Sequence, residues 1–115
     1  MKRLFSILLF AALTACATAP QSPAQTVYAI QGAYAGALTA AVAYKALPAC
    51  SATVPLPCSE KAVVARLQAA DDKAYSALST AQSLVRNGLN ASNAIEAAEL
   101  AVKAMTAITS TIRSK

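Results

Sequence analysis

A chain of 115 residues with ten basic, five acidic and no histidine side chains has room for one small domain and offers few groups for acid–base catalysis. Beyond residue 15, eight basic and five acidic residues remain scattered along the chain and give a net charge of +3. Because nucleic-acid binding needs a clustered basic stripe, we expect no nucleic-acid partner. Much of the apolar content is alanine, the best helix former, which predicts long helices around a thin core.

Residues 1–15 have the layout of a secretory signal peptide. Lys2 and Arg3 precede an apolar run from Leu4 to Leu13, which only Ser6 interrupts. A run of about 10 residues is too short to cross a bilayer core of about 30 Å, which needs roughly 20 residues. We therefore expect this segment to be cleaved and not to remain as a membrane span.

The end of the run, Leu13-Thr14-Ala15-Cys16, resembles the lipobox of bacterial lipoproteins. The resemblance implies that the Cys16 sulfur receives a diacylglycerol, that the chain is cut just before it, and that the new amino group is acylated, as with palmitate. Two or three acyl chains give a stable membrane anchor. Ala17, where the family can carry an aspartate, implies the outer membrane facing the periplasm, with an inner-membrane anchor as the alternative. The competing interpretation is an ordinary signal peptide cut near Ala15 and a soluble periplasmic protein.

The other two cysteines predict a disulfide. With Cys16 assigned to lipid, Cys50 and Cys58 form an even number in an oxidising compartment. A metal site is the alternative, but the chain has no histidine and no second cysteine pair. We expect no metal and no cofactor.

The first helix is expected over residues 23–46, after a lipidated tether at residues 16–22. Ser22 and Gln25 can form a capping box around Pro23, and Pro48 stops the helix. Its apolar positions recur at helical spacing: Val27, Ile30, Tyr34, Leu38, Ala41 and Tyr44.

Gly32 and Gly36 form a GxxxG pattern in this helix. In a membrane the pattern indicates close helix dimerisation, but an alanine-dominated helix with Gln31 and Lys45 inside it inserts weakly. We therefore predict that both glycines let a neighbouring helix approach within the bundle. The proline-rich segment 48–59 that follows is an irregular loop, serving as a helix connector or as a binding tip.

The second helix is expected over residues 60–87, with Ser59 as its cap and Gly88 ending it at a positive φ. A broad apolar stripe runs along it: Val63, Val64, Leu67, Ala70, Ala74, Leu78, Ala81, Leu84 and Val85. Asp71 and Asp72 are adjacent, so they point about 100° apart on a helix. This favours a solvated face over paired carboxylates in catalysis.

The third helix is expected over residues 91–113, with Asn90 as its cap and Leu89 packing back onto its first turns. Its apolar residues are Ile95, Ala98, Val102, Met105, Ile108 and Ile112. The tight connection to the second helix predicts an all-α domain over residues 23–115, an antiparallel three-helix bundle of up-down-up topology.

These features favour a non-catalytic protein, since no nucleophile–base pair or metal motif is present in the sequence. A small, lipid-anchored helical envelope protein that presents an interaction surface is the leading hypothesis, with another copy or an envelope protein as partner. One alternative is a membrane-active (lysis- or toxin-like) or self-assembling protein of the kind that prophages encode. The other is a soluble secreted helical protein with an ordinary signal peptide.

Overall fold

The computed structural model describes residues 21–113, so the signal peptide, Cys16 and the expected tether as far as residue 20 lie outside the described residues. Three helices follow one another: α2 (Pro23–Lys45), α3 (Lys61–Arg86) and α4 (Ser92–Arg113). Each end lies within one residue of its expected position. The predicted all-α three-helix bundle is thereby confirmed.

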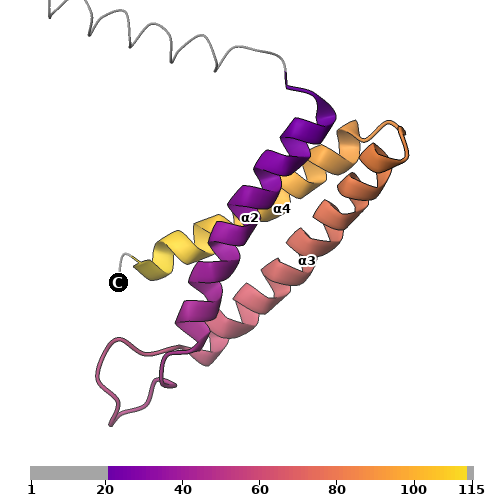
Figure 1. The fold of residues 1–115 in the computed structure, drawn as a ribbon. Helices are drawn as coiled ribbons and strands as arrows, with labels where there is room; N and C mark the ends of the chain where they lie inside the picture. Colours follow the sequence, from indigo (N-terminus) through magenta and orange to yellow (C-terminus); the bar gives the residue numbers. More distant parts are fainter. Residues whose placement is uncertain (1–20, 114–115) are drawn as a thin grey trace, which may run out of the picture.

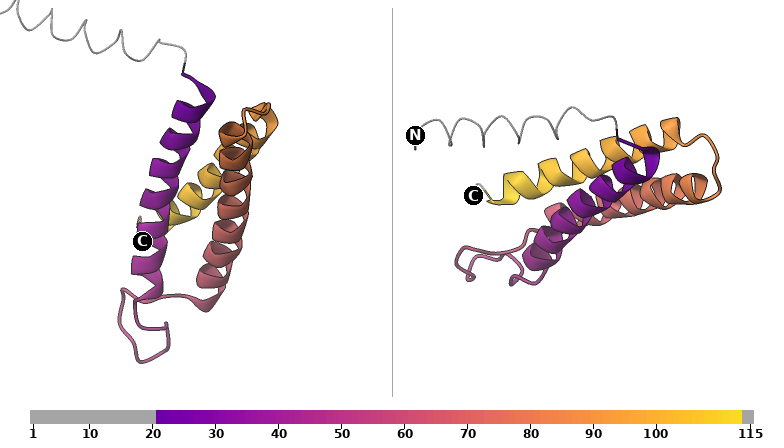
Figure 2. Two further views of the ribbon diagram at one scale, coloured as in Figure 1. Left: turned by 45° about the vertical axis from the view of Figure 1, so that its right-hand side comes forward. Right: turned by 45° about the horizontal axis from the view of Figure 1, so that its top comes forward.

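The helices form a closed arrangement in which each one contacts the other two. α2 and α3 run antiparallel from the 46–60 connection, and α4 lies across one face of this pair (Figure 1). The last turns of α4 diverge from the first turns of α3, so the bundle is more open at the end where the 46–60 connection lies (Figure 2).

Local signals in the sequence fix the start of α2 and the end of α3. The backbone nitrogen of Gln25 donates to Ser22 Oγ at 3.3 Å, and the backbone nitrogen of Ser22 donates to Gln25 Oε1 at 2.9 Å. This is the predicted capping box, with Pro23 in the first turn. Gly88 has a φ of 66°, which a glycine adopts without the steric cost that a Cβ would bring.

The start of α4 follows only part of its prediction. The backbone nitrogen of Ser92 donates to Asn90 Oδ1 at 3.0 Å, so the amide oxygen satisfies one of the free N–H groups of the first turn. Leu89 is 58% exposed and does not pack back onto the helix. The buried residue at this end is Ala91, two positions further along the chain.

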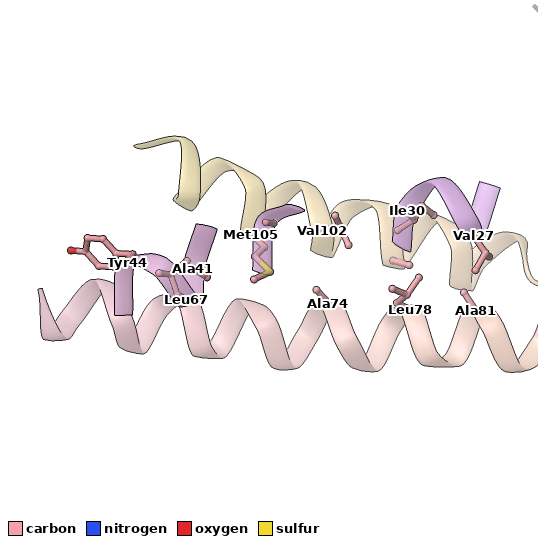
Figure 3. Packing of buried hydrophobic residues seen from close by; sticks show 12 residues of the cluster. Val27, Ile30, Ala41, Tyr44, Leu67, Ala74, Leu78, Ala81, Val102 and Met105 are labelled. Atoms are coloured by element: carbon pink, nitrogen blue, oxygen red, sulfur yellow. The ribbon is translucent and has the colours of Figure 1, made fainter. Parts of the chain in front are cut away.

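The core is a thin layer between the three helices. Among the described residues, six of the thirteen buried apolar side chains are alanines, and Met105 is the one large side chain that is completely enclosed. Alanine methyl groups let the helices approach closely but remove little apolar area from water. Figure 3 shows this layer from Tyr44 at one end to Val27 and Ala81 at the other, with Met105 in the middle.

The predicted role of Gly32 and Gly36 is wrong. Both glycines are exposed on α2, and a Cβ built on either one would meet no atom within 4 Å. No helix of the bundle approaches them, because α2 turns its stripe of Val27, Ile30 and Tyr44 toward α3 and α4 instead. A GxxxG pattern gives the spacing of two glycines but does not determine which side of an apolar helix is buried.

This correction predicts that Gly36→Ala stabilises the protein. Alanine has lower backbone entropy in the unfolded chain and finds open space in the folded one, so the free energy of unfolding rises by about 0.5–1 kcal/mol. The measurement is urea unfolding followed by circular dichroism. Gly88→Ala is the matched control and should lower stability by about 1 kcal/mol, because its φ is left-handed. A stability loss in Gly36→Ala would show that this face is packed.

Candidate functional site

The connection between α2 and α3, residues 46–60, is a closed corner. Cys50 and Cys58 form the predicted disulfide, with their Sγ atoms 2.03 Å and their Cα atoms 4.9 Å apart. Closing a loop between residues separated by eight positions removes conformations from the unfolded chain. The loop therefore enters the folded state already restricted.

Backbone hydrogen bonds close the corner further around Ser59. The Ser59 nitrogen donates to the Pro48 carbonyl at 2.8 Å, and the Cys50 nitrogen donates to the Ser59 carbonyl at 3.0 Å. The Ser59 hydroxyl, which is buried, donates to the Leu47 carbonyl at 3.0 Å. The prediction that Ser59 caps α3 is therefore wrong, since the N-cap is Glu60 and the Ser59 hydroxyl donates to the Leu47 carbonyl just beyond the end of α2.

Tyr44 supplies the cap that Ser59 does not. The N-cap residue of α3 is Glu60, and its side chain makes no capping bond. Its backbone nitrogen donates instead to the buried Tyr44 hydroxyl at 2.8 Å. A residue in the last turn of α2 thus accepts a hydrogen bond from the start of α3, which fixes the angle between the two helices.

An apolar groove of about 560 Å³ opens beside this corner, where α4 diverges from α3. Its lining residues come from the end of α2, the loop, the start of α3 and the end of α4: Tyr44, Leu47, Leu56, Pro57, Cys58, Glu60, Val63, Arg66, Ile108, Thr111 and Ile112. Leu56 is 84% exposed at the edge of the groove. Most of the lining is apolar, and its two charged residues, Glu60 and Arg66, are exposed.

The chemistry of this corner groove is that of a binding surface. Its apolar floor with a few polar groups is typical of ligand and partner sites. Its lining contains no cysteine thiol, since Cys58 is part of the disulfide. Within residues 21–113, no three histidine, cysteine, aspartate or glutamate side chains gather as they would to hold a metal ion.

Only some of the site residues predicted from the sequence lie near the corner groove. Cys58 lines the groove and is bonded to Cys50, whereas Gly32 and Gly36 are exposed on α2 and are not among the residues that line the groove. Cys16 lies outside the described residues. Within the described part of the chain, no helix combines the length and hydropathy that a bilayer-spanning segment needs.

Asp71 departs from its predicted place on a solvated face. It is half-buried between α2 and α3, and its Oδ1 accepts a hydrogen bond of 2.6 Å from the Tyr34 hydroxyl. Asp72 is exposed, as predicted. Burial raises the pKa of Tyr34 to about 12, and the hydrogen bond to Asp71 and the charge of that carboxylate act in the same direction.

Comparisons with known proteins identify no relative of this chain. No family model, curated protein or solved structure matches this chain.

The Tyr34 phenol predicts a loss of stability at alkaline pH. The unfolded chain ionises this group near pH 10 and the folded protein only near pH 12. Because the folded pKa is raised, its contribution is fully present below pH 10 and is lost as the pH rises toward 12. Urea unfolding at about pH 9 and about pH 11 should show this loss in the wild type and in Tyr75→Phe, but less of it in Tyr34→Phe. An equal loss in Tyr34→Phe would contradict the assignment.

The disulfide predicts a stability difference on reduction. The chain-entropy relation gives about 2.6 kcal/mol for a flexible loop of this length, and Pro55 and Pro57 stiffen the open loop, so we expect about 2 kcal/mol. The urea midpoint should fall in the presence of reductant.

A variant carrying both Cys50→Ser and Cys58→Ser is the control. It should unfold at the midpoint of the reduced wild type and should not respond to reductant. A wild-type midpoint that reduction leaves unchanged would show that the hydrogen bonds around Ser59 and Tyr44 hold the corner without the covalent bond.

Proposed function

We propose that this protein is a small, lipid-anchored helical protein of the bacterial envelope, which presents the corner groove as a non-catalytic interaction surface. The observation that carries the proposal is the position of the groove. It lies at the end of α2 opposite to the residues that would be tethered to a membrane.

The lipobox resemblance at Leu13-Thr14-Ala15-Cys16 supports the anchor. Residues 17–21 lie between Cys16 and the cap of α2, a length of chain that spans about 20 Å at most. The start of α2 is thus held close to the membrane surface. Ala17, after the lipidated position, favours the outer membrane with the bundle facing the periplasm.

The length of α2 supports presentation away from the membrane. A helix of 23 residues extends about 34 Å, which is the distance between the tethered end and the corner. The disulfide and the Tyr44 hydrogen bond make that distal end rigid. A rigid surface binds with a smaller entropy cost than a mobile one.

The lining of the groove favours a partner that buries apolar side chains. Leu56 at the edge, with Ile108 and Ile112 from α4, leaves apolar area open to water. The exposed charges of Glu60 and Arg66 can orient such a partner. An apolar segment of another envelope protein fits this surface.

The anchor is tested by the intact mass of the protein isolated from membranes without reductant. The proposal predicts a chain that begins at Cys16, carries acyl chains and lacks two hydrogens for the Cys50–Cys58 disulfide. A chain cut elsewhere and free of lipid would contradict the anchor and leave a soluble exported protein.

The presenting surface is tested by photo-crosslinking in intact cells. A photoreactive residue replaces Leu56 in one variant and Tyr28 in the other. Both are strongly exposed, but Leu56 lies in the loop after α2 and Tyr28 lies near the start of α2. We expect the Leu56 position to crosslink to one discrete envelope species that the Tyr28 position does not reach. Equal products, or none from Leu56, would contradict the assignment of the partner surface to the corner groove.

A further inference from the structure

Charge is distributed unevenly along the bundle. The described residues at the corner end include four cations and one carboxylate: Lys45, Lys61, Arg66, Arg113 and Glu60. The rest of the described chain holds three cations and four carboxylates: Lys73, Arg86, Lys103, Asp71, Asp72, Glu96 and Glu99. The net positive charge of residues 21–113 therefore lies at the end of the bundle where the corner groove opens.

The four cations of this end lie in the groove lining or directly beside it in the chain. Arg66 is itself a lining residue. The other three come directly after lining residues of α2, α3 and α4: Lys45 after Tyr44, Lys61 after Glu60, and Arg113 after Ile112. All four side chains are exposed, and none of them forms an ion pair with a described residue. Their charge is thus available to a partner at the groove.

The neighbouring carboxylates of α3 lie too far along the bundle to neutralise this end. Asp71 accepts its hydrogen bond from Tyr34, whereas the start of α3 donates to Tyr44. Tyr34 and Tyr44 are ten residues apart, so the two contacts are separated by about 15 Å along α2. Asp71 and the adjacent Asp72 therefore belong to the middle of the bundle. Among the described carboxylates, Glu60 alone lies at the groove.

We infer that the corner groove binds an acidic amphipathic segment of its partner protein. The apolar side chains of the segment enter the groove, and its carboxylates meet the surrounding cations. This inference rests on the proposed function, because it names the chemistry of the partner at the same site. Opposite charges across an interface speed encounter and fix orientation. The small negative balance of the other described residues directs an acidic segment away from the rest of the bundle and toward the corner.

The placement of the cations favours a polypeptide over a lipid. They come from three helices, so they match several carboxylates spaced along a chain, whereas a fatty acid or phospholipid carries its charge on one headgroup. The surface is also concave, with a volume of about 560 Å³, within the range of sites that enclose inserted groups. A flat bilayer would contact projecting residues such as Leu56 and leave the hollow unfilled.

Charge reversal combined with photo-crosslinking tests the inference. The full-length protein carries the photoreactive residue at the Leu56 position and is irradiated in intact cells. Arg66→Glu together with Arg113→Glu should lower the yield of the partner crosslink about tenfold, since carboxylates then face carboxylates. Arg66→Lys together with Arg113→Lys should keep most of the yield, because the positive charges remain.

The matched control is Lys73→Glu together with Lys103→Glu. Both lysines are exposed and lie outside the groove lining, and the pair changes the net charge of the protein by the same amount. This control should leave the yield unchanged. Circular dichroism of the purified variants reports whether each one is folded. An equal fall in yield for the control pair and the arginine pair would overturn the assignment to the groove.

Mass spectrometry of the crosslinked product provides the second measurement. We expect the attached partner peptide to carry at least two aspartate or glutamate residues within about two helical turns of the attachment point, that is, about seven residues. A peptide without such carboxylates, or a phospholipid in its place, overturns the inference.

The outcomes separate this inference from the proposed function. A discrete partner crosslink whose yield does not respond to the arginine reversal overturns the acidic segment alone and leaves the presenting surface in place. No crosslink from the Leu56 position in the otherwise unchanged protein overturns both.

Discussion

The hydrogen bond from the Glu60 backbone nitrogen to the Tyr44 hydroxyl, 2.8 Å long, determines how α2 and α3 meet. The first N–H groups of a helix have no partner within the helix, and leaving a donor unsatisfied costs about 1–3 kcal/mol. Glu60 does not cap α3 with its own side chain, so the end of α2 satisfies this need. The start of one helix is thereby tied to the last turn of the other, and the disulfide and Ser59 hold the loop between them.

This constraint matters because the core stabilises the bundle only weakly. Ala74, Ala81 and Ala98 are fully enclosed, yet a methyl group contributes far less than a leucine or phenylalanine side chain. Helices that meet through methyl groups can pack closely, but their contact removes little apolar area from water. Covalent and polar constraints at the corner compensate, as they do in other small domains with limited cores.

The corner groove follows from the same geometry. With α2 and α3 fixed at the corner, α4 covers one face of the pair and diverges from α3 near its own end (Figure 1). That divergence opens the corner groove. A lipidated N-terminus would place the corner groove far from the membrane.

The sequence allowed the helices and their ends to be predicted because the signals are local. Ser22 with Pro23, Pro48 and Gly88 each act on their immediate neighbours, and the apolar stripes give the buried faces of α3 and α4. The disulfide followed from the number of cysteines.

The remaining features depend on how separate elements are positioned. The bond from Tyr34 to Asp71 and the cap that Tyr44 provides join different helices, so no local pattern indicates them. Gly32 and Gly36 were misassigned because α2 is apolar on more than one side, which leaves its rotation open until its neighbours are placed. The corner groove arises from the divergence of α4, which no spacing in the sequence encodes.

Hydrogen exchange at the Glu60 amide tests the corner most directly. In an isolated helix the amide at this position has no partner and exchanges freely. Because Tyr44 accepts its hydrogen, we predict strong protection in the wild type and its loss in Tyr44→Phe, while the amide of Leu78 in the middle of α3 stays protected in both. Free exchange at Glu60 in the wild type would show that Tyr44 does not hold the start of α3.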